Sequence, residues 1–62
     1  MIEIETNFKD YFVMTDKDDN CVEFMHGCFY SRLEGDEEPV KSELQFSFEE
    51  AWQEAKLLLG VD

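Results

Sequence analysis

The sequence predicts an α+β fold: a small, mostly antiparallel sheet of about three to five strands packed against one C-terminal helix. Two observations support this prediction. Apolar and polar residues alternate in the N-terminal half, as they do along a strand with one buried face, whereas residues 47–59 follow the repeat of an amphipathic helix. Because the chain has 62 residues, we expect one domain, residues 1–62, built around one core.

Two strands are expected before the first polar turn. Residues 2–5 alternate isoleucine with glutamate, which is the pattern of a strand with one wet face. Residues 11–15 are aromatic and β-branched, which favours a second strand. The polar run at residues 16–20 then predicts a turn.

A hairpin is predicted next. Its strands cover residues 21–26 and 28–33, and its turn lies at His26 and Gly27. Glycine readily adopts the positive φ that a tight hairpin turn requires. Residues 34–39 contain glycine, proline and four acids, so we expect them to form a loop.

The helix is the most clearly marked element, and a short last strand at residues 43–46 is expected just before it. Ser47 and Glu50 have the spacing of a capping box, in which each side chain bonds the backbone of the other residue. Gly60 is well placed to end the helix. One buried stripe is expected to contain Phe48, Ala51, Trp52, Ala55, Leu58 and Leu59.

Composition and charge exclude several classes of protein. The chain has 16 acidic and 5 basic residues, and its net charge of −11 repels phosphate, so we expect no direct binding of nucleic acid. At 44% hydrophobic and 15% aromatic it is too apolar for a disordered acidic tail. It contains no apolar run long enough to span a membrane, and residues 1–5 lack the basic region of a signal peptide. We therefore expect a cytoplasmic protein.

The turn at residues 16–20 resembles the start of a calcium-binding loop. Asp16, Asp18 and Asn20 occupy the first ligand positions of that motif. The required glycine is replaced by Cys21, however, and the required glutamate by Gly27. A solvated hairpin turn is the better interpretation.

Cys21, His26 and Cys28 are the only residues with zinc-type nitrogen or sulfur ligands, one fewer than a structural site uses. A two-residue turn pairs Met25 with Cys28 and Cys21 with Arg32, which separates the two sulfurs by roughly 13 Å along the ladder. That distance excludes a disulfide and a shared metal. We expect buried or half-buried free thiols, and no metal or cofactor.

Catalysis is not indicated either. Cys28 and His26 are the only cysteine–histidine pair close in sequence, and no third residue is placed to orient them. No two carboxylates are singled out for acid–base work, and so short a chain has little room for a closed pocket. We therefore expect a protein that is not an enzyme.

The acidic surface is the remaining candidate for function. Residues 34–62 carry nine acids and two bases, whereas residues 1–33 carry seven acids and three bases. The simple interpretation is solvation. The alternative is that carboxylates replace phosphates, since alternate strand positions such as Glu3 and Glu5 lie about 7 Å apart on one face. The residues predicted to contact a basic protein partner are Glu34, Asp36, Glu37, Glu38, Glu43 and Glu49.

A second hypothesis places the binding surface on the sheet. A single helix covers only one face, so the other face must hold some of Tyr11, Met25, Cys28 and Tyr30. A free strand edge at residues 28–33 could also pair with a strand of a partner. This predicts a structural, assembly or adaptor module. The chain is expected to be a monomer or a small homo-oligomer.

The order of elements resembles that of many very small bacteriophage and prophage proteins. The resemblance rests on the strand at residues 11–14 (YFVM), the polar turn, the hairpin, and residues 46–51 (FSFEEA) at the start of the helix. Compact acidic proteins of this kind resemble inhibitors of host nucleic-acid enzymes: anti-CRISPR proteins, anti-restriction proteins and uracil-DNA glycosylase inhibitors. The resemblance implies a phage-encoded, non-catalytic inhibitor that binds stoichiometrically and blocks the nucleic-acid-binding groove of a host defence or DNA-processing enzyme.

Overall fold

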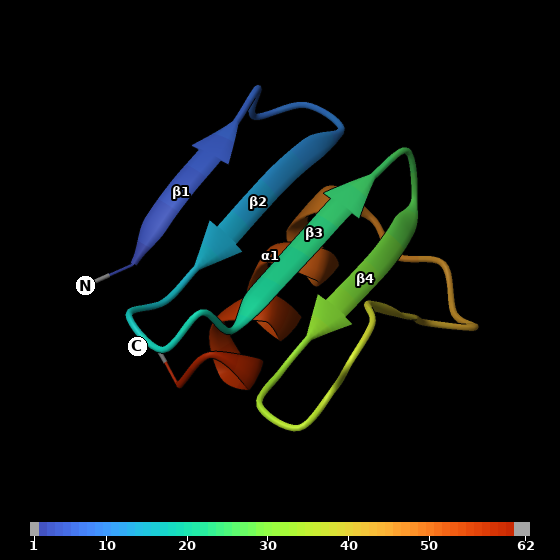
Figure 1. Ribbon diagram of the computed structural model, residues 1–62. Coiled ribbons are helices and arrows are strands. Elements are labelled where there is room, and N and C mark those ends of the chain that lie inside the picture. The colour runs from blue at the N-terminus through green and yellow to red at the C-terminus, as the bar shows by residue number, and fades with distance from the viewer. Residues whose placement is uncertain (1, 61–62) are drawn as a thin grey trace.

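The computed structural model describes residues 2–60 and confirms the α+β prediction (Figure 1). Residues 1, 61 and 62 of the expected domain lie outside this description. Five strands form one antiparallel sheet in which spatial order equals chain order, and one helix covers one face. The elements are β1 (Glu3–Thr6), β2 (Tyr11–Thr15), β3 (Cys21–Met25), β4 (Cys28–Arg32), β5 (Val40–Lys41) and α1 (Phe48–Leu58).

The predicted hairpin between β3 and β4 is confirmed with its register. Met25 pairs with Cys28, and the strands end one residue earlier than expected, at Met25 and Arg32. His26 and Gly27 have φ values of 51° and 87°. Two successive positive φ values are typical of the type I′ turn, whose twist matches that of the strands it joins.

The prediction of a short last strand at residues 43–46 is wrong. The fifth strand, β5, lies earlier, at Val40–Lys41, and pairs with Tyr30 and Ser31 of β4. The Ser42 N–H still donates to the Phe29 carbonyl (2.8 Å), but the Ser42 hydroxyl then accepts the Leu44 N–H (3.1 Å). The strand pairing ends here, because the serine hydroxyl competes with ladder partners for backbone donors.

The position of β5 also corrects the hypothesis of a free edge at residues 28–33. β4 is an inner strand, bonded to β3 on one side and to β5 on the other. The edges of the sheet are β1 and β5. A partner strand can therefore not add to β4.

The core lies between the sheet and α1. Alternate residues of β2, β3 and β4 point to the helix, and two alanines of α1 allow the helix to approach the sheet closely. Each fully buried large side chain contributes about 1.5–3 kcal/mol relative to leaving it exposed. The buried residues are Phe12, Met14, Val22, Phe24, Phe29, Ala51 and Ala55.

The ends of α1 follow the prediction. The Ser47 hydroxyl accepts the Glu50 N–H (3.2 Å), and the Glu50 carboxylate accepts the Ser47 N–H (3.1 Å), which completes the capping box. These bonds lower the pKa of Glu50. Leu59 is the C-cap and Gly60, with φ of 70°, follows it. Across residues 2–60, no helix is long and apolar enough to cross a membrane.

The expected helical stripe is fully buried only at Ala51 and Ala55. Leu58 is 39% exposed, and Trp52, expected in the core, is half-buried and packs against the core, as Phe48 and Leu59 do. The reason is the narrow contact that small Ala51 and Ala55 make with the sheet, which leaves flanking side chains partly in solvent. One side of α1 therefore carries an accessible aromatic ring.

Candidate functional site

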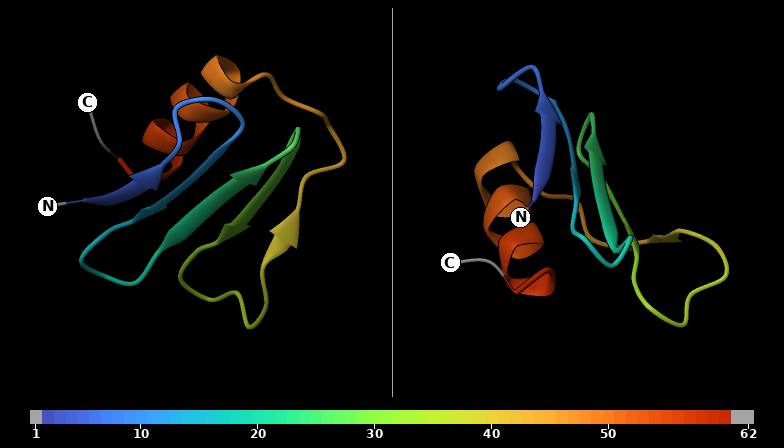
Figure 2. Two further views of the ribbon diagram at one scale, coloured as in Figure 1. Left: turned by 90° about the horizontal axis from the view of Figure 1, so that it is seen from above. Right: turned by 60° about the vertical axis from the view of Figure 1, so that its left-hand side comes forward.

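The loop between β4 and β5 presents four of the predicted acids. It extends beyond the end of the sheet, on the side away from α1 (Figure 2). Glu34, Asp36, Glu37 and Glu38 are all exposed. The Leu33 N–H donates to Asp36 Oδ2 (3.2 Å), so this carboxylate also holds the turn at the start of the loop.

The base of the acidic loop is tied to the turn between β2 and β3. The Glu34 N–H donates to Asn20 Oδ1 (2.7 Å), and Asn20 Nδ2 donates to Asp16 Oδ2 (2.9 Å). Asp16 Oδ1 accepts the backbone N–H groups of Asp18 and Asn20. The hydrogen bond from the Asn20 side chain is the main reason that the pKa of Asp16 is lowered. The Asp-x-Asp-x-Asn pattern is thus explained by a turn that positions the loop.

A shallow concavity lies where the acidic loop meets the uncovered face of the sheet. Its volume is about 550 Å³, and Glu38 of the loop lines it together with Glu23, Tyr30 and Arg32 of the strands. Glu23 and Tyr30 are register partners on neighbouring strands. Sequence reasoning missed Glu23, although its position in the expected strand put it on the same face as Tyr30.

The structure does not gather all the predicted acids at one place. Glu43 is exposed in the segment that leads from β5 to the helix. Glu49 is exposed in the first turn of α1, behind the sheet, and lines a different concavity from Glu38. The six residues therefore divide between the acidic loop, the segment that leads to the helix, and the helix itself.

The charges of the surface are largely uncompensated within the chain. Among residues 2–60 the single contact of the salt-bridge type joins His26 Nδ1 to Asp10 Oδ2, 3.2 Å apart, and it is an ion pair only when His26 is protonated. In this described part of the chain, no lysine or arginine forms a salt bridge with an acid. The carboxylates of the acidic loop are consequently available to cations from outside the molecule.

The uncovered face of the sheet combines aromatic, apolar and acidic side chains. Tyr11, Val13 and Tyr30 are half-buried there, Met25 is exposed, and Glu5 lies on the same face at the edge strand. Burial raises the pKa of the Tyr11 hydroxyl, and the nearby carboxylates act in the same direction. This face confirms the expectation that the sheet leaves Tyr11 and Tyr30 outside the core.

Both cysteines are free and half-buried, as expected. Cys21 pairs with Arg32, and Cys28 with Met25, so the two thiols lie at opposite ends of the hairpin. Within residues 2–60, no three side chains of the histidine, cysteine, aspartate or glutamate type are grouped to hold a metal ion.

Comparison of the chain with protein-family models, with curated proteins and with solved structures finds no match. Function is therefore inferred from the side chains and their arrangement.

Proposed function

We propose that this protein is a non-catalytic inhibitor that binds a basic protein surface and blocks a nucleic-acid-binding site there. The observation that supports this most directly is the excess of unpaired carboxylates. The chain has 16 acids and 5 bases, and the ion pair found among residues 2–60 uses a histidine and no lysine or arginine. Repulsion among these charges opposes folding, which gives the acidity a cost that binding to a cationic partner would offset.

The acidic loop is the proposed centre of this surface. Glu37 and Glu38 are exposed on a loop whose base is held by Asn20 and whose first turn is held by Asp36. A loop fixed in this way presents its charges with little loss of conformational freedom on binding. Its carboxylates would attract the lysines and arginines that normally neutralise phosphates, and would chiefly raise the association rate and the specificity.

The partner proposed is a host defence or DNA-processing enzyme, as the resemblance to small acidic phage inhibitors implies. The cytoplasm is the proposed compartment, since both cysteines are free thiols and disulfides are rare in that reducing environment. Glu3 and Glu5, at alternate positions of β1, lie at the opposite edge of the sheet from the acidic loop and would form a second, separate row of carboxylates.

The test is capture of partners from bacterial lysate by the tagged protein, followed by elution with duplex DNA or with buffer alone. We expect a nucleic-acid-binding enzyme that DNA displaces. Glu38→Lys should weaken its capture by about tenfold or more, because a like charge is then placed against a basic site. Glu54→Lys is the matched control, since it makes the same charge change on α1. Equal effects of the two variants, or a partner indifferent to DNA, would contradict the proposal.

A second candidate function is an adaptor that binds through the uncovered sheet face. The half-buried side chains of Tyr11, Val13 and Tyr30 favour it, because tyrosine is enriched at the centres of interfaces. Ionic strength separates the two candidates. Binding through the acidic loop should weaken steeply as salt is raised, whereas binding through the sheet face should change little.

A further inference from the structure

Phe8, in the turn between β1 and β2, has an unusual conformation. Its φ is 58°, in the left-handed region, and its side chain is 76% exposed. A bulky residue in this region is uncommon, and the strain amounts to about 1–3 kcal/mol. A polar residue such as asparagine would adopt the same backbone with less strain. Neither the local backbone nor burial therefore accounts for a phenylalanine at this position.

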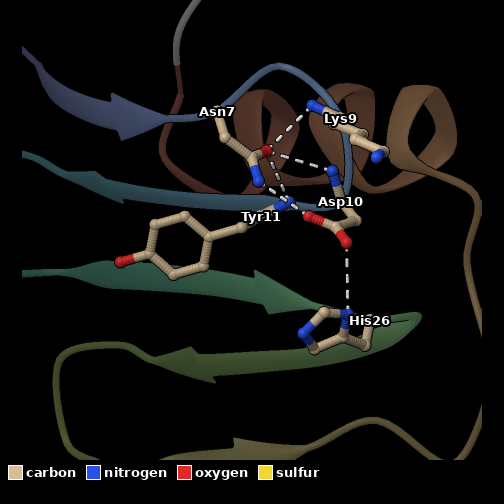
Figure 3. Close-up of polar contacts among 5 residues, drawn as sticks. All are labelled: Asn7, Lys9, Asp10, Tyr11 and His26. Carbon is tan, nitrogen blue, oxygen red and sulfur yellow. Dashed lines mark hydrogen bonds and ion pairs between the residues drawn. The ribbon is translucent and has the colours of Figure 1, made fainter.

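The turn holds Phe8 firmly in this conformation. The Phe8 N–H donates to the Thr6 hydroxyl (2.8 Å). Figure 3 shows how Asn7 organises the rest of the turn: its Oδ1 accepts three backbone N–H groups, at 2.9, 3.1 and 3.2 Å, those of Lys9, Asp10 and Tyr11. Asn7 Nδ2 also donates to Asp10 Oδ1 (2.7 Å), and Asp10 pairs with His26. The exposed ring is thus carried on a rigid support.

A series of aromatic contacts links this exposed ring to the core. The ring centroids of Phe8 and Trp52 are 6.2 Å apart. Trp52 stacks on Phe48 with ring centroids 5.5 Å apart, and it forms a T-shaped pair with buried Phe12 at 5.3 Å. The accessible rings are therefore fixed by the core and lose little freedom when a ligand binds to them.

These rings line a second concavity, which we call the aromatic notch. It has a volume of about 410 Å³ and is formed by Phe8, Phe48, Trp52, Glu49 and Gln53. Glu49 lies three residues before Trp52 and four before Gln53 on α1, so these side chains share one side of the helix. The notch combines aromatic faces with one carboxylate at its margin.

We propose that the aromatic notch binds an arginine side chain of the protein partner. A guanidinium group stacks on aromatic faces and can bond a carboxylate through two N–H groups, whereas an ammonium group offers a point charge. An anionic group would be repelled by the net charge of −11, and a purely apolar group would leave the Glu49 carboxylate desolvated without a partner. The inference rests on the proposed function only in taking the partner to be basic.

The notch contains the one tryptophan of the chain, so intrinsic fluorescence reports on it directly. The probe is acetyl-Gly-Arg-Gly-amide, and the control peptide replaces arginine with citrulline, which has the same shape without the charge. We expect the arginine peptide to give a saturable change of Trp52 fluorescence with a dissociation constant on the order of 1–10 mM, and the citrulline peptide to give none.

Two variants locate the binding site. Phe8→Asn should weaken the binding of the arginine peptide by about threefold to tenfold, because it removes one aromatic face of the notch. It should leave the midpoint of thermal unfolding unchanged or higher, because asparagine tolerates the positive φ. Glu49→Gln should weaken it by a similar factor, and Glu54→Gln, elsewhere on α1, should not change it. Equal binding of both peptides, no saturable response up to about 50 mM, or full binding by either notch variant would overturn the proposal. Displacement of a captured enzyme by DNA tests the acidic loop separately.

Discussion

Replacing Phe12 tests whether the aromatic contacts at the centre of the core hold the sheet and helix together. Phe12 is 0% exposed, and its ring meets Phe24, Phe48 and Trp52 at centroid distances of 5.5, 5.6 and 5.3 Å. Truncation of a buried phenylalanine to alanine costs about 3–5 kcal/mol. The free energy of unfolding of a protein is about 0.05–0.15 kcal/mol per residue, which gives about 3–9 kcal/mol for a chain of 62 residues. Phe12→Ala should therefore remove most or all of the folding stability.

A milder variant keeps the prediction measurable if Phe12→Ala does not fold. Phe12→Leu retains most of the side-chain volume and loses the aromatic pairs, so we expect it to lower the free energy of unfolding by about 1–2 kcal/mol. Urea unfolding followed by Trp52 fluorescence and by far-ultraviolet circular dichroism gives this quantity. Phe8→Leu is the matched control, because it makes the same change at an exposed ring and should stay within about 0.5 kcal/mol. Equal losses at the two positions would refute this account of the core.

Three further predictions concern the turns and the helix. Asp16 has a lowered pKa, so the stability it contributes is present above its ordinary pKa of 3.8 and is lost as pH falls through the lower folded value. Asp16→Asn should flatten the dependence of the urea midpoint on pH in that acid range, and an unchanged pH profile would contradict it. Ser47→Ala should lower the free energy of unfolding by about 1 kcal/mol, because it removes the acceptor for the Glu50 N–H. Thermal unfolding measures this, and an unchanged midpoint would contradict the role of the capping box. Gly27→Ala should lower the free energy of unfolding by about 1 kcal/mol in the same assay, because its φ of 87° strains any residue with a Cβ. No atom lies within 4 Å of the added Cβ, so the cost arises in the backbone alone. A neutral result would mean that the turn changes its conformation.

The elements that sequence predicts well are those whose signals are local. The capping box of Ser47 and Glu50 sets the start of α1 within four residues, and Gly60 sets its end. The turn at His26 and Gly27 fixes the register of β3 on β4, because a two-residue loop leaves only one alignment of its strands.

The elements that sequence reasoning missed depend on distant contacts. Residues 43–46 alternate as a strand does, yet the fifth strand forms at Val40–Lys41, where the loop returns the chain to β4. The candidate site divides in the same way. The acids of the loop are evident from composition, but Glu38 and Glu23 line one concavity only because the folded sheet brings the loop beside β3. The pairing of Phe8 with Trp52 has no local signal, since it joins a turn near one terminus to the helix near the other.

The exposed edge at β1 has a consequence for the behaviour of concentrated solutions. β1 is four residues long, whereas β5 at the opposite edge has only two, so β1 offers the longer row of unpaired backbone groups for strand addition by another copy. Charge on Glu3 and Glu5 keeps such copies apart at neutral pH. Ile4, which is 49% exposed, lies between them on the strand, so without these two charges β1 would present an uncharged edge. Replacing both charges, as Glu3→Gln together with Glu5→Gln, is therefore expected to promote fibrillar aggregation that begins at β1.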